Sequence, residues 1–173
     1  MFNTWASEGP TKQETIDYII ESCQGAEEKY TKYTAEEPKI EKHQYSTNSI
    51  KIIDNNLIVD VTRQVNYFNQ SGKKVIDEDW PQKNGRTVAK LPLDHQTFVQ
   101  ISSMYGYHPK VLLYFGCTEN SNSQCHQTIW NDAKKNGDYP TPGFVVCNKR
   151  KRVLKAFKHL KELINTEDDD PFK

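Results

Sequence analysis

The segment from Asn148 to Ile164 reads NKRKRVLKAFKHLKELI, and it is the best-formed amphipathic helix in the chain. Successive residues of an α-helix are rotated by about 100° around its axis. One stripe of this helix therefore holds four apolar residues, Val153, Phe157, Leu160 and Ile164. Such a stripe is wide enough to bury against a sheet. The segment predicts a C-terminal helix that closes the domain.

The first turn of the same helix is strongly basic, with Lys149, Arg150, Lys151 and Arg152 in succession. The helix macrodipole disfavours cations at this end, so the cluster indicates either plain solvation or an anionic partner. A phosphate, an anionic lipid or an acidic protein would suit it. The acidic run 167–170 follows the helix and partly neutralises the cluster, which argues against nucleic acid.

The totals indicate one polar-surfaced domain. The chain has 173 residues and a formal net charge of zero, so no global field steers it to DNA or to a membrane. No apolar run approaches the length of a transmembrane segment. The opening MFNTWASEGP lacks the basic and apolar regions of a signal peptide. We therefore expect a cytoplasmic protein as written, with a periplasmic or secreted location still open if a leader was removed.

A short helix is expected near the N-terminus. Thr11 and Glu14 form a capping-box pattern, and Gly25 is a natural stop, so the helix should run from about Lys12 to Gln24. Its apolar face holds Ile16, Ile19, Ile20 and Cys23. Residues 1–10 read as a loose arm.

The chain between the two helices has the two-residue period of β-strands. Segments 45–53 and 57–63 predict a hairpin around the turn Asp54-Asn55-Asn56. The charged segment 27–42, which contains Pro38, reads as a linker or mobile loop. Further short strands are expected at 75–76, 87–91, 110–117, 125–130 and 143–147. Segment 65–68 either continues the preceding strand or begins a new one, and 94–104 fits a helix turn as well as a strand, with the strand preferred. We expect 110–117 to be a central strand that pairs with 125–130.

These elements define the expected architecture. Six to eight antiparallel strands lie between two terminal helices, which makes the fold class α+β with a β-rich barrel or sandwich. A single folded body spans residues 11–165, and an acidic flexible tail spans 166–173. A strand-rich body whose open end is plugged by a C-terminal helix resembles the pleckstrin-homology-like barrel. A helix-flanked open sheet or sandwich is also compatible with the pattern.

Both ends of the chain carry a family resemblance. The opening PTKQETIDYI and the closing KRVLKAFKHLKELI are similar to the ends of small uncharacterised bacterial proteins with a β-rich body between two helices. The resemblance covers only the ends of the chain. It implies a pleckstrin-homology-like or similar β-rich fold, and it implies no site residue.

The four cysteines leave the redox compartment open. Cys117 and Cys125 flank the polar loop CTENSNSQC, and their spacing suits a hairpin disulfide in an oxidising compartment. Cys23 and Cys147 lie in apolar patterns and read as small buried hydrophobic residues. No CxxC pair occurs, so we predict no structural zinc site and no other metal.

The sequence lacks the motifs of common enzyme active sites. It contains no GxSxG, no HExxH, no phosphate-binding glycine loop and no dinucleotide fingerprint. The histidines at 43, 95 and 108 have polar neighbours and read as solvated loop residues. We therefore predict no cofactor and disfavour an enzyme. A scattered site, such as a cysteine hydrolase that uses Cys117 or Cys125, remains an alternative.

Aromatic residues in or beside turn-rich segments favour a binding function instead. They are Trp80, Tyr105, Tyr107, Trp130 and Tyr139. Exposed aromatic rings beside charges are typical of protein-binding surfaces. The sequence therefore predicts a non-enzymatic binding module that recognises another protein, such as a bacterial immunity or adaptor protein. Anionic lipid or phosphate binding at the basic helix start is the alternative, and the oligomeric state is open.

Overall fold

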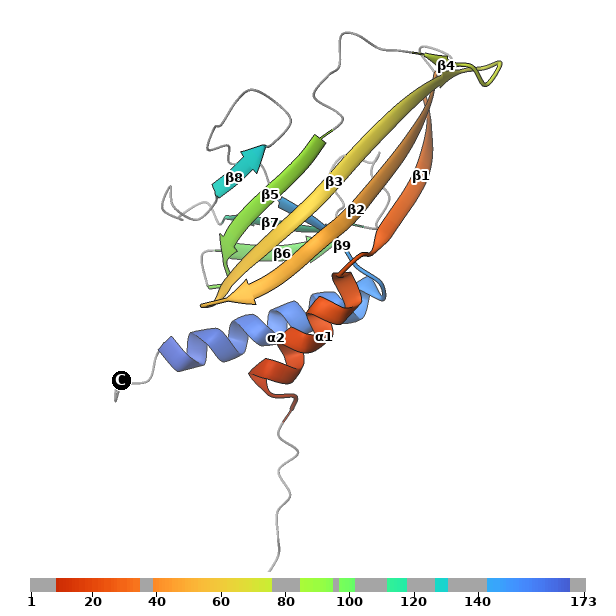
Figure 1. Cartoon of the computed structure of the whole chain (residues 1–173). Helices are drawn as coiled ribbons and strands as arrows, with labels where there is room; N and C mark the ends of the chain where they lie inside the picture. The colour runs from red at the N-terminus through yellow and green to blue at the C-terminus, as the bar shows by residue number, and fades with distance from the viewer. Residues whose placement is uncertain are drawn as a thin grey trace, which may run out of the picture.

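The computed structural model describes residues 9–34, 39–75, 85–94, 97–101, 112–117, 127–130 and 143–168. Within these ranges it contains two helices and nine strands (Figure 1). The helices are α1 (Lys12–Cys23) and α2 (Arg150–Asp168). The strands are β1 (Glu27–Thr34), β2 (Lys39–Ile53), β3 (Asn56–Asn69), β4 (Lys74–Val75), β5 (Gly85–Pro92), β6 (Thr97–Ile101), β7 (Leu112–Cys117), β8 (Gln127–Trp130) and β9 (Gly143–Val146).

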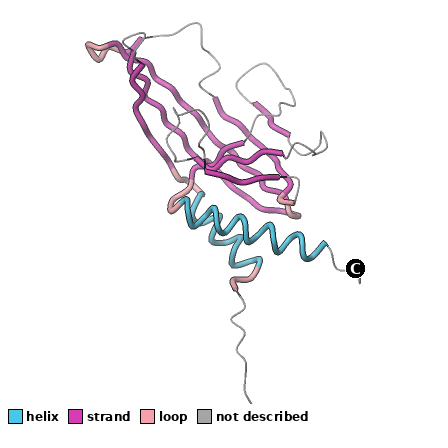
Figure 2. Tube along the Cα trace, turned by 180° about the vertical axis from the view of Figure 1, so that it is seen from behind, coloured by secondary structure: helices cyan, strands magenta, loops and turns pink. Residues whose placement is uncertain are grey.

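The strands form two antiparallel sheets. The larger sheet has the order β1-β2-β3-β5-β8, with β4 paired to β3, and the smaller sheet has the order β6-β7-β9. Together they curl into a half-barrel, and the two helices lie under one end of it (Figure 1). The view from behind shows the far ends of the long strands projecting away from the helices (Figure 2). The α+β class, the antiparallel strands and the two terminal helices are confirmed.

The β2–β3 hairpin is the longest element of the fold. Its turn places Asp54 and Asn55 at φ 48° and 58°, in the left-handed region that a two-residue hairpin turn requires. Ile53 pairs with Asn56 across this turn, so the turn is one residue shorter than the predicted Asp54-Asn55-Asn56. Alternate residues of β3 (Leu57, Val59 and Val61) are all but fully buried. The predicted hairpin is confirmed, and both of its strands are longer than expected.

The prediction of a linker over residues 27–42 is wrong where the structure describes it. Residues 27–34 form β1, and residues 39–42 begin β2, which pairs with β1 on one side and β3 on the other. The charges misled the prediction because they occur on both faces of these strands, so no alternation of charged and apolar residues marks a buried face. The face turned to the core also carries Tyr30, His43 and Tyr45, which stack on one another.

The predicted partner of the 110–117 segment is also wrong. β8 pairs with β5, with Val88 opposite Ile129, and it belongs to the larger sheet. β7 is the central strand of the smaller sheet, as predicted, but its neighbours are β6 and β9. Nearness in sequence suggested a hairpin, whereas the chain crosses from one sheet to the other between β7 and β8.

The core lies between the two sheets and the helix layer. The apolar stripe of α2 is buried as predicted, with Val153, Phe157 and Leu160 at 0% exposure. The Phe157 ring meets the Phe115 ring of β7 edge to face, with 4.9 Å between centroids. The Lys161 ammonium donates to the Thr97 carbonyl and so ties α2 to β6. Burial lowers the Lys161 pKa, an effect that the Asp94 carboxylate opposes.

The two terminal segments differ from their predictions. The capping box of Thr11 and Glu14 is present, yet residue 10 is not loose, since His159 Nε2 donates to the Pro10 carbonyl at 2.9 Å. α2 continues to Asp168, so the predicted start of the tail at residue 166 is wrong. The first helix breaker after Ile164 is Pro171, which explains why the helix extends into the acidic run. Residues 1–8 and 169–173 are outside the described ranges.

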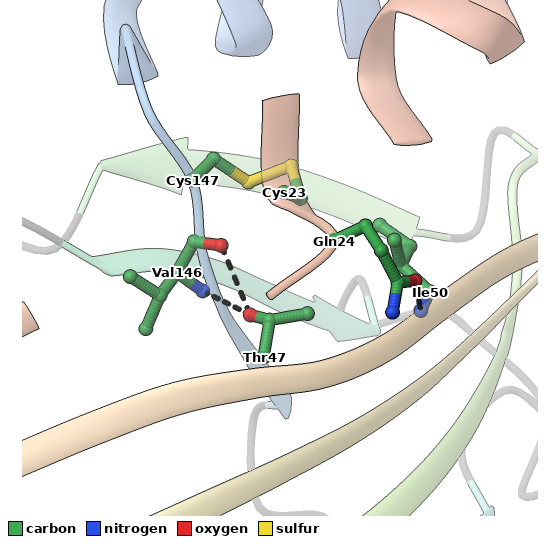
Figure 3. The surroundings of a disulfide bond; sticks show 6 residues. All are labelled: Cys23, Gln24, Thr47, Ile50, Val146 and Cys147. Carbon is green, nitrogen blue, oxygen red and sulfur yellow. Dashed lines mark hydrogen bonds between the residues drawn. A yellow bond between two sulfur atoms is a disulfide. The ribbon is translucent and has the colours of Figure 1, made fainter. Parts of the chain in front are cut away.

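A disulfide joins α1 to the strand that leads into α2 (Figure 3). Cys23 and Cys147 are bonded, with 4.0 Å between their Cα atoms and a sequence separation of 124. Both are buried, as the sequence indicates, but their pairing was not predicted. β7 and β8 form no hairpin, and the bond between Cys117 and Cys125 stays a prediction. Cys125 itself is outside the described residues.

A buried polar junction beside the disulfide joins the two sheets. The Thr47 hydroxyl accepts from the Val146 N–H and donates to the Val146 carbonyl, each at 2.9 Å (Figure 3). A β-bulge follows in β2, between Thr47 and Ser49. The Gln24 side chain caps it by accepting from the Ile50 N–H at 3.1 Å and donating to the Asn48 carbonyl at 2.8 Å.

Candidate protein-binding surface

The structure describes only part of the predicted binding set. Trp80, Tyr105, Tyr107 and Tyr139 are outside the described residues. Trp130 ends β8 opposite Thr87, and only its backbone is described. The aromatic-loop surface therefore stays a prediction.

The basic residues at the start of α2 are all described. Lys149 precedes the helix at φ 52°, in the left-handed region. Its side chain and those of Lys151 and Arg152 are exposed, and Arg150 is half-buried. The first turn of α2 contains no acidic residue. These facts suit a solvated face and an anion site equally, so the anion site also stays a prediction.

A hollow of about 290 Å³ lies on β1, β2 and β3, on the sheet face turned away from the core. Strand alternation and the register place six of its residues on that outer face: Lys29, Thr31, Lys42, Gln44, Asn66 and Phe68. Tyr30 and His43 complete the lining, and their side chains belong to the opposite face. The described lining of the hollow therefore comes from three neighbouring strands.

The hollow combines cations, amides and one aromatic ring. The Lys42 ammonium lies 4.6 Å from the centroid of the Phe68 ring, in a cation–π contact. Lys29 lies at the other side of the hollow, where Glu27 contacts its ammonium at 3.7 Å. Glu27 also accepts from Gln44 at 3.5 Å. Glu27 is not among the lining residues, so the part of the lining that the structure describes has two lysines and no carboxylate.

A row of stacked rings supports the hollow from the opposite face of the sheet. The His43 ring lies 4.3 Å from the Tyr30 ring at an interplanar angle of 6°, and Tyr45 continues the row. His43 is 5% exposed, and its Nε2 lies 2.8 Å from Glu41 Oε2. The prediction of a solvated loop histidine at position 43 is therefore wrong. The stacking fixes the β1–β2 pair from which the hollow is built.

The electrostatics of this row are those of a packed interior. Burial raises the pKa of Tyr30, and a hydrogen bond with Tyr45 adds to the effect. The Arg63 guanidinium lies 5.7 Å from the centroid of the Tyr45 ring. Since Tyr30 stays protonated at neutral pH, its ring acts as an aromatic surface with a hydroxyl donor.

Two further properties concern the described part of the chain. No group of three or more His, Cys, Asp or Glu side chains within it is arranged to bind a metal ion. Neither α1 nor α2 is long and apolar enough to span a membrane.

The hollow was not predicted, because the charged segment 27–42 reads as a linker. A usable signal was present. In EEKYTKYT, tyrosine and threonine, which favour strands, fill four of the eight positions, and Glu41, His43 and Tyr45 repeat at a spacing of two. The register between the strands, which no short pattern specifies, then brings Lys29, Lys42 and Phe68 to one surface.

Comparisons with protein-family models, curated proteins and solved structures found no match. The fold and the surface described above are therefore the basis for a functional assignment. The resemblance to a pleckstrin-homology-like barrel stays a prediction.

Proposed function

We propose that the protein is a non-enzymatic binding module that recognises another protein, by holding an acidic segment of that partner in the hollow on β1, β2 and β3. The observation that carries the proposal is the composition of the lining within the described residues, which has Lys29 and Lys42 but no carboxylate. Charge complementarity of this kind sets association rate and specificity at protein interfaces. Phe68 offers a flat apolar surface to a side chain beside the acidic group.

The proposed partner engages a rigid surface. The hollow is built on paired strands and supported by stacked rings. This protein therefore loses little conformational entropy of its own when a segment of the partner docks there. This preorganisation suits a protein that sequesters its partner, as bacterial immunity and adaptor proteins do.

Binding to matched peptides tests the proposal. Two fluorescently labelled peptides, Glu-Glu-Tyr-Glu-Glu and Lys-Lys-Tyr-Lys-Lys, are titrated by anisotropy at low and high salt. We expect binding of the acidic peptide only, weakened by salt because the contact is ionic. Equal binding of the two peptides, or none at low salt, would contradict the proposal.

Charge reversals locate the contact. In the double variant Lys29→Glu/Lys42→Glu, binding of the acidic peptide should be lost. The matched control is Lys51→Glu/Lys90→Glu, since both lysines are exposed and flank Ile58 on the same outer face at the other end of the sheet. Affinity capture with the three proteins should then recover a partner that only the hollow variant fails to retain. If the control variant loses binding to the same extent, the loss comes from the change in net charge and not from the hollow.

We also infer that the protein folds in an oxidising compartment, such as the periplasm or the cell exterior. The buried Cys23–Cys147 bond supports this, because structural disulfides are rare where thioredoxin and glutathione keep thiols reduced. Thiol titration and peptide mapping of protein isolated from its host without reductant would test it. Recovery of Cys23 and Cys147 as free thiols in the folded protein would overturn the inference.

A further inference from the structure

The outer edge of β1 is a second surface, distinct from the hollow. β1 lies at one end of the strand order and is bonded to β2 on one side (Figure 1). Among the strands that the structure describes, none pairs with its other side. An edge of this length presents a row of N–H and C=O groups that can accept another strand.

The hydrogen bonds at the start of β1 determine which residues face outward. The Thr47 N–H donates to the Ala26 carbonyl, and the Thr47 carbonyl accepts from the Gly25 N–H. Residues of an antiparallel strand bond alternately to one side and the other. Counted from Ala26, the backbone groups that face away from β2 belong to Glu27, Lys29, Thr31 and Tyr33.

We propose that β1 pairs with β1 of a second copy of this chain, antiparallel, about a two-fold axis at Tyr30. This register places Glu27 opposite Tyr33 of the second copy and Lys29 opposite Thr31 of the second copy. All four outward-facing residues of each strand then find partners in one closed, two-fold symmetric interface. The larger sheets of the two copies become one continuous sheet.

The charges of β1 favour this register over its neighbours. With the axis at Tyr30, Glu28 lies opposite Lys32 of the second copy, and symmetry forms this pair twice. Both residues occupy non-hydrogen-bonded positions, where facing side chains are closest. Moving the axis to Lys29 sets two lysines against each other, and moving it to Thr31 leaves no pair of opposite charges.

The aromatic residues fit the same arrangement. Tyr30 and His43 are stacked across neighbouring strands, and strands of a sheet repeat at about 4.8 Å. The row of rings therefore continues across the axis into the second copy. Tyr33, which is 76% exposed in the single chain, gains Glu27 and Lys29 of the second copy as neighbours.

The dimer has a consequence for binding. Lys29 and Thr31 line the hollow and lie on β1, so the hollows of the two copies flank the same seam. An acidic partner with two suitable segments would gain avidity from such a pair.

Sedimentation velocity of the full-length, disulfide-bonded protein over a series of concentrations tests the proposal. We expect a reversible monomer–dimer equilibrium. Glu28→Lys and Lys32→Glu, which each set like charges opposite at both pairs, should weaken dimerisation on the order of tenfold or more. An equal mixture of the two variants should form a heterodimer, because both pairs are then of opposite charge. The Lys51→Glu variant is the matched control and should dimerise normally.

Folding of each variant is checked by circular dichroism. If Lys32→Glu fails to fold, Thr31→Pro replaces it, since it removes an outward-facing N–H that the β1–β2 pairing does not use. A protein that stays monomeric at every concentration would overturn the proposal. So would a dimer that Glu28→Lys and Thr31→Pro leave unchanged, because such a dimer uses another surface.

The test is separable from that of the proposed function. Lys42→Glu leaves β1 unaltered, so it should weaken binding of the acidic peptide and leave the dimer intact. Conversely, if Glu28→Lys loses the dimer but still binds the acidic peptide, peptide binding does not require the dimer.

Discussion

Cys23 at the end of α1 is bonded to Cys147 at the exit of β9, across a sequence separation of 124. The bond joins α1 to the segment that leads from β9 into α2. Next to it, the Asn148 N–H donates to the Ser22 carbonyl at 2.8 Å. The junction closes the chain on itself with both covalent and hydrogen bonds.

Loss of this disulfide should destabilise the protein strongly. Cross-linking a loop of this length restricts the unfolded chain, and removal of a native disulfide typically costs about 2–5 kcal/mol. We expect the double variant Cys23→Ser/Cys147→Ser to lower the free energy of unfolding in urea by that amount. Adding reductant to the wild type should reproduce the loss. If reductant destabilises the double variant as well, the reduction of another disulfide accounts for the loss of stability in the wild type.

The Thr47→Val substitution should destabilise the junction between the sheets. Valine has nearly the shape of threonine but cannot bond the Val146 N–H and carbonyl, which then stay buried without Thr47 as their partner. The expected loss is about 1–3 kcal/mol in urea unfolding. Thr31→Val on exposed β1 is the matched control and should change stability little. Equal effects in the two variants would contradict the assigned role.

The Asp60–Arg86 pair should make stability depend on acidic pH. The hydrogen bonds from Arg86 hold the Asp60 pKa below its usual range, with a smaller contribution from Asn48 and an opposing one from burial. A carboxyl whose pKa is lowered in the folded state stabilises the protein above its unfolded pKa of about 3.9. That stability is lost as the pH falls through the lower folded value.

Replacement of Arg86 tests this dependence. Arg86→Gln should lower the urea midpoint of unfolding at pH 7. In this variant the midpoint should also decrease less than in the wild type when the pH is lowered from 5 to strongly acidic values. Arg152→Gln, at an exposed site on α2, is the control for loss of one positive charge. If both variants keep the wild-type dependence of the urea midpoint on pH, the Asp60–Arg86 pair does not cause the loss of stability in acid.

The Phe157→Ala substitution should test the closing role of α2. Its ring is fully buried against Phe115, so truncation leaves a cavity between the helix and the smaller sheet. The expected cost is about 3–5 kcal/mol, measured by chemical denaturation. Phe157→Leu, which fills much of the space, should lose less. Lys158→Ala on the exposed face is the control, and a loss as large as that of Phe157→Ala would contradict the orientation of the helix.

The sequence by itself determined the elements whose causes are local. The Thr11 capping box, the Asp54-Asn55 turn and the α2 stripe each depend on residues a few positions apart, and each was predictable. Their geometry follows from side-chain spacing and backbone conformation within one helix turn or one hairpin. The fold class followed from the same patterns.

Tertiary structure decided the features that join distant parts of the chain. The Cys23–Cys147 bond, the pairing of β8 with β5 and the hollow on β1–β3 all depend on register and sheet order. Alternation indicates which face a residue occupies, but it does not indicate which strand becomes its neighbour. For the same reason the sequence revealed the charges of β1, and only the pairing with β2 showed which backbone groups remain on the outer edge.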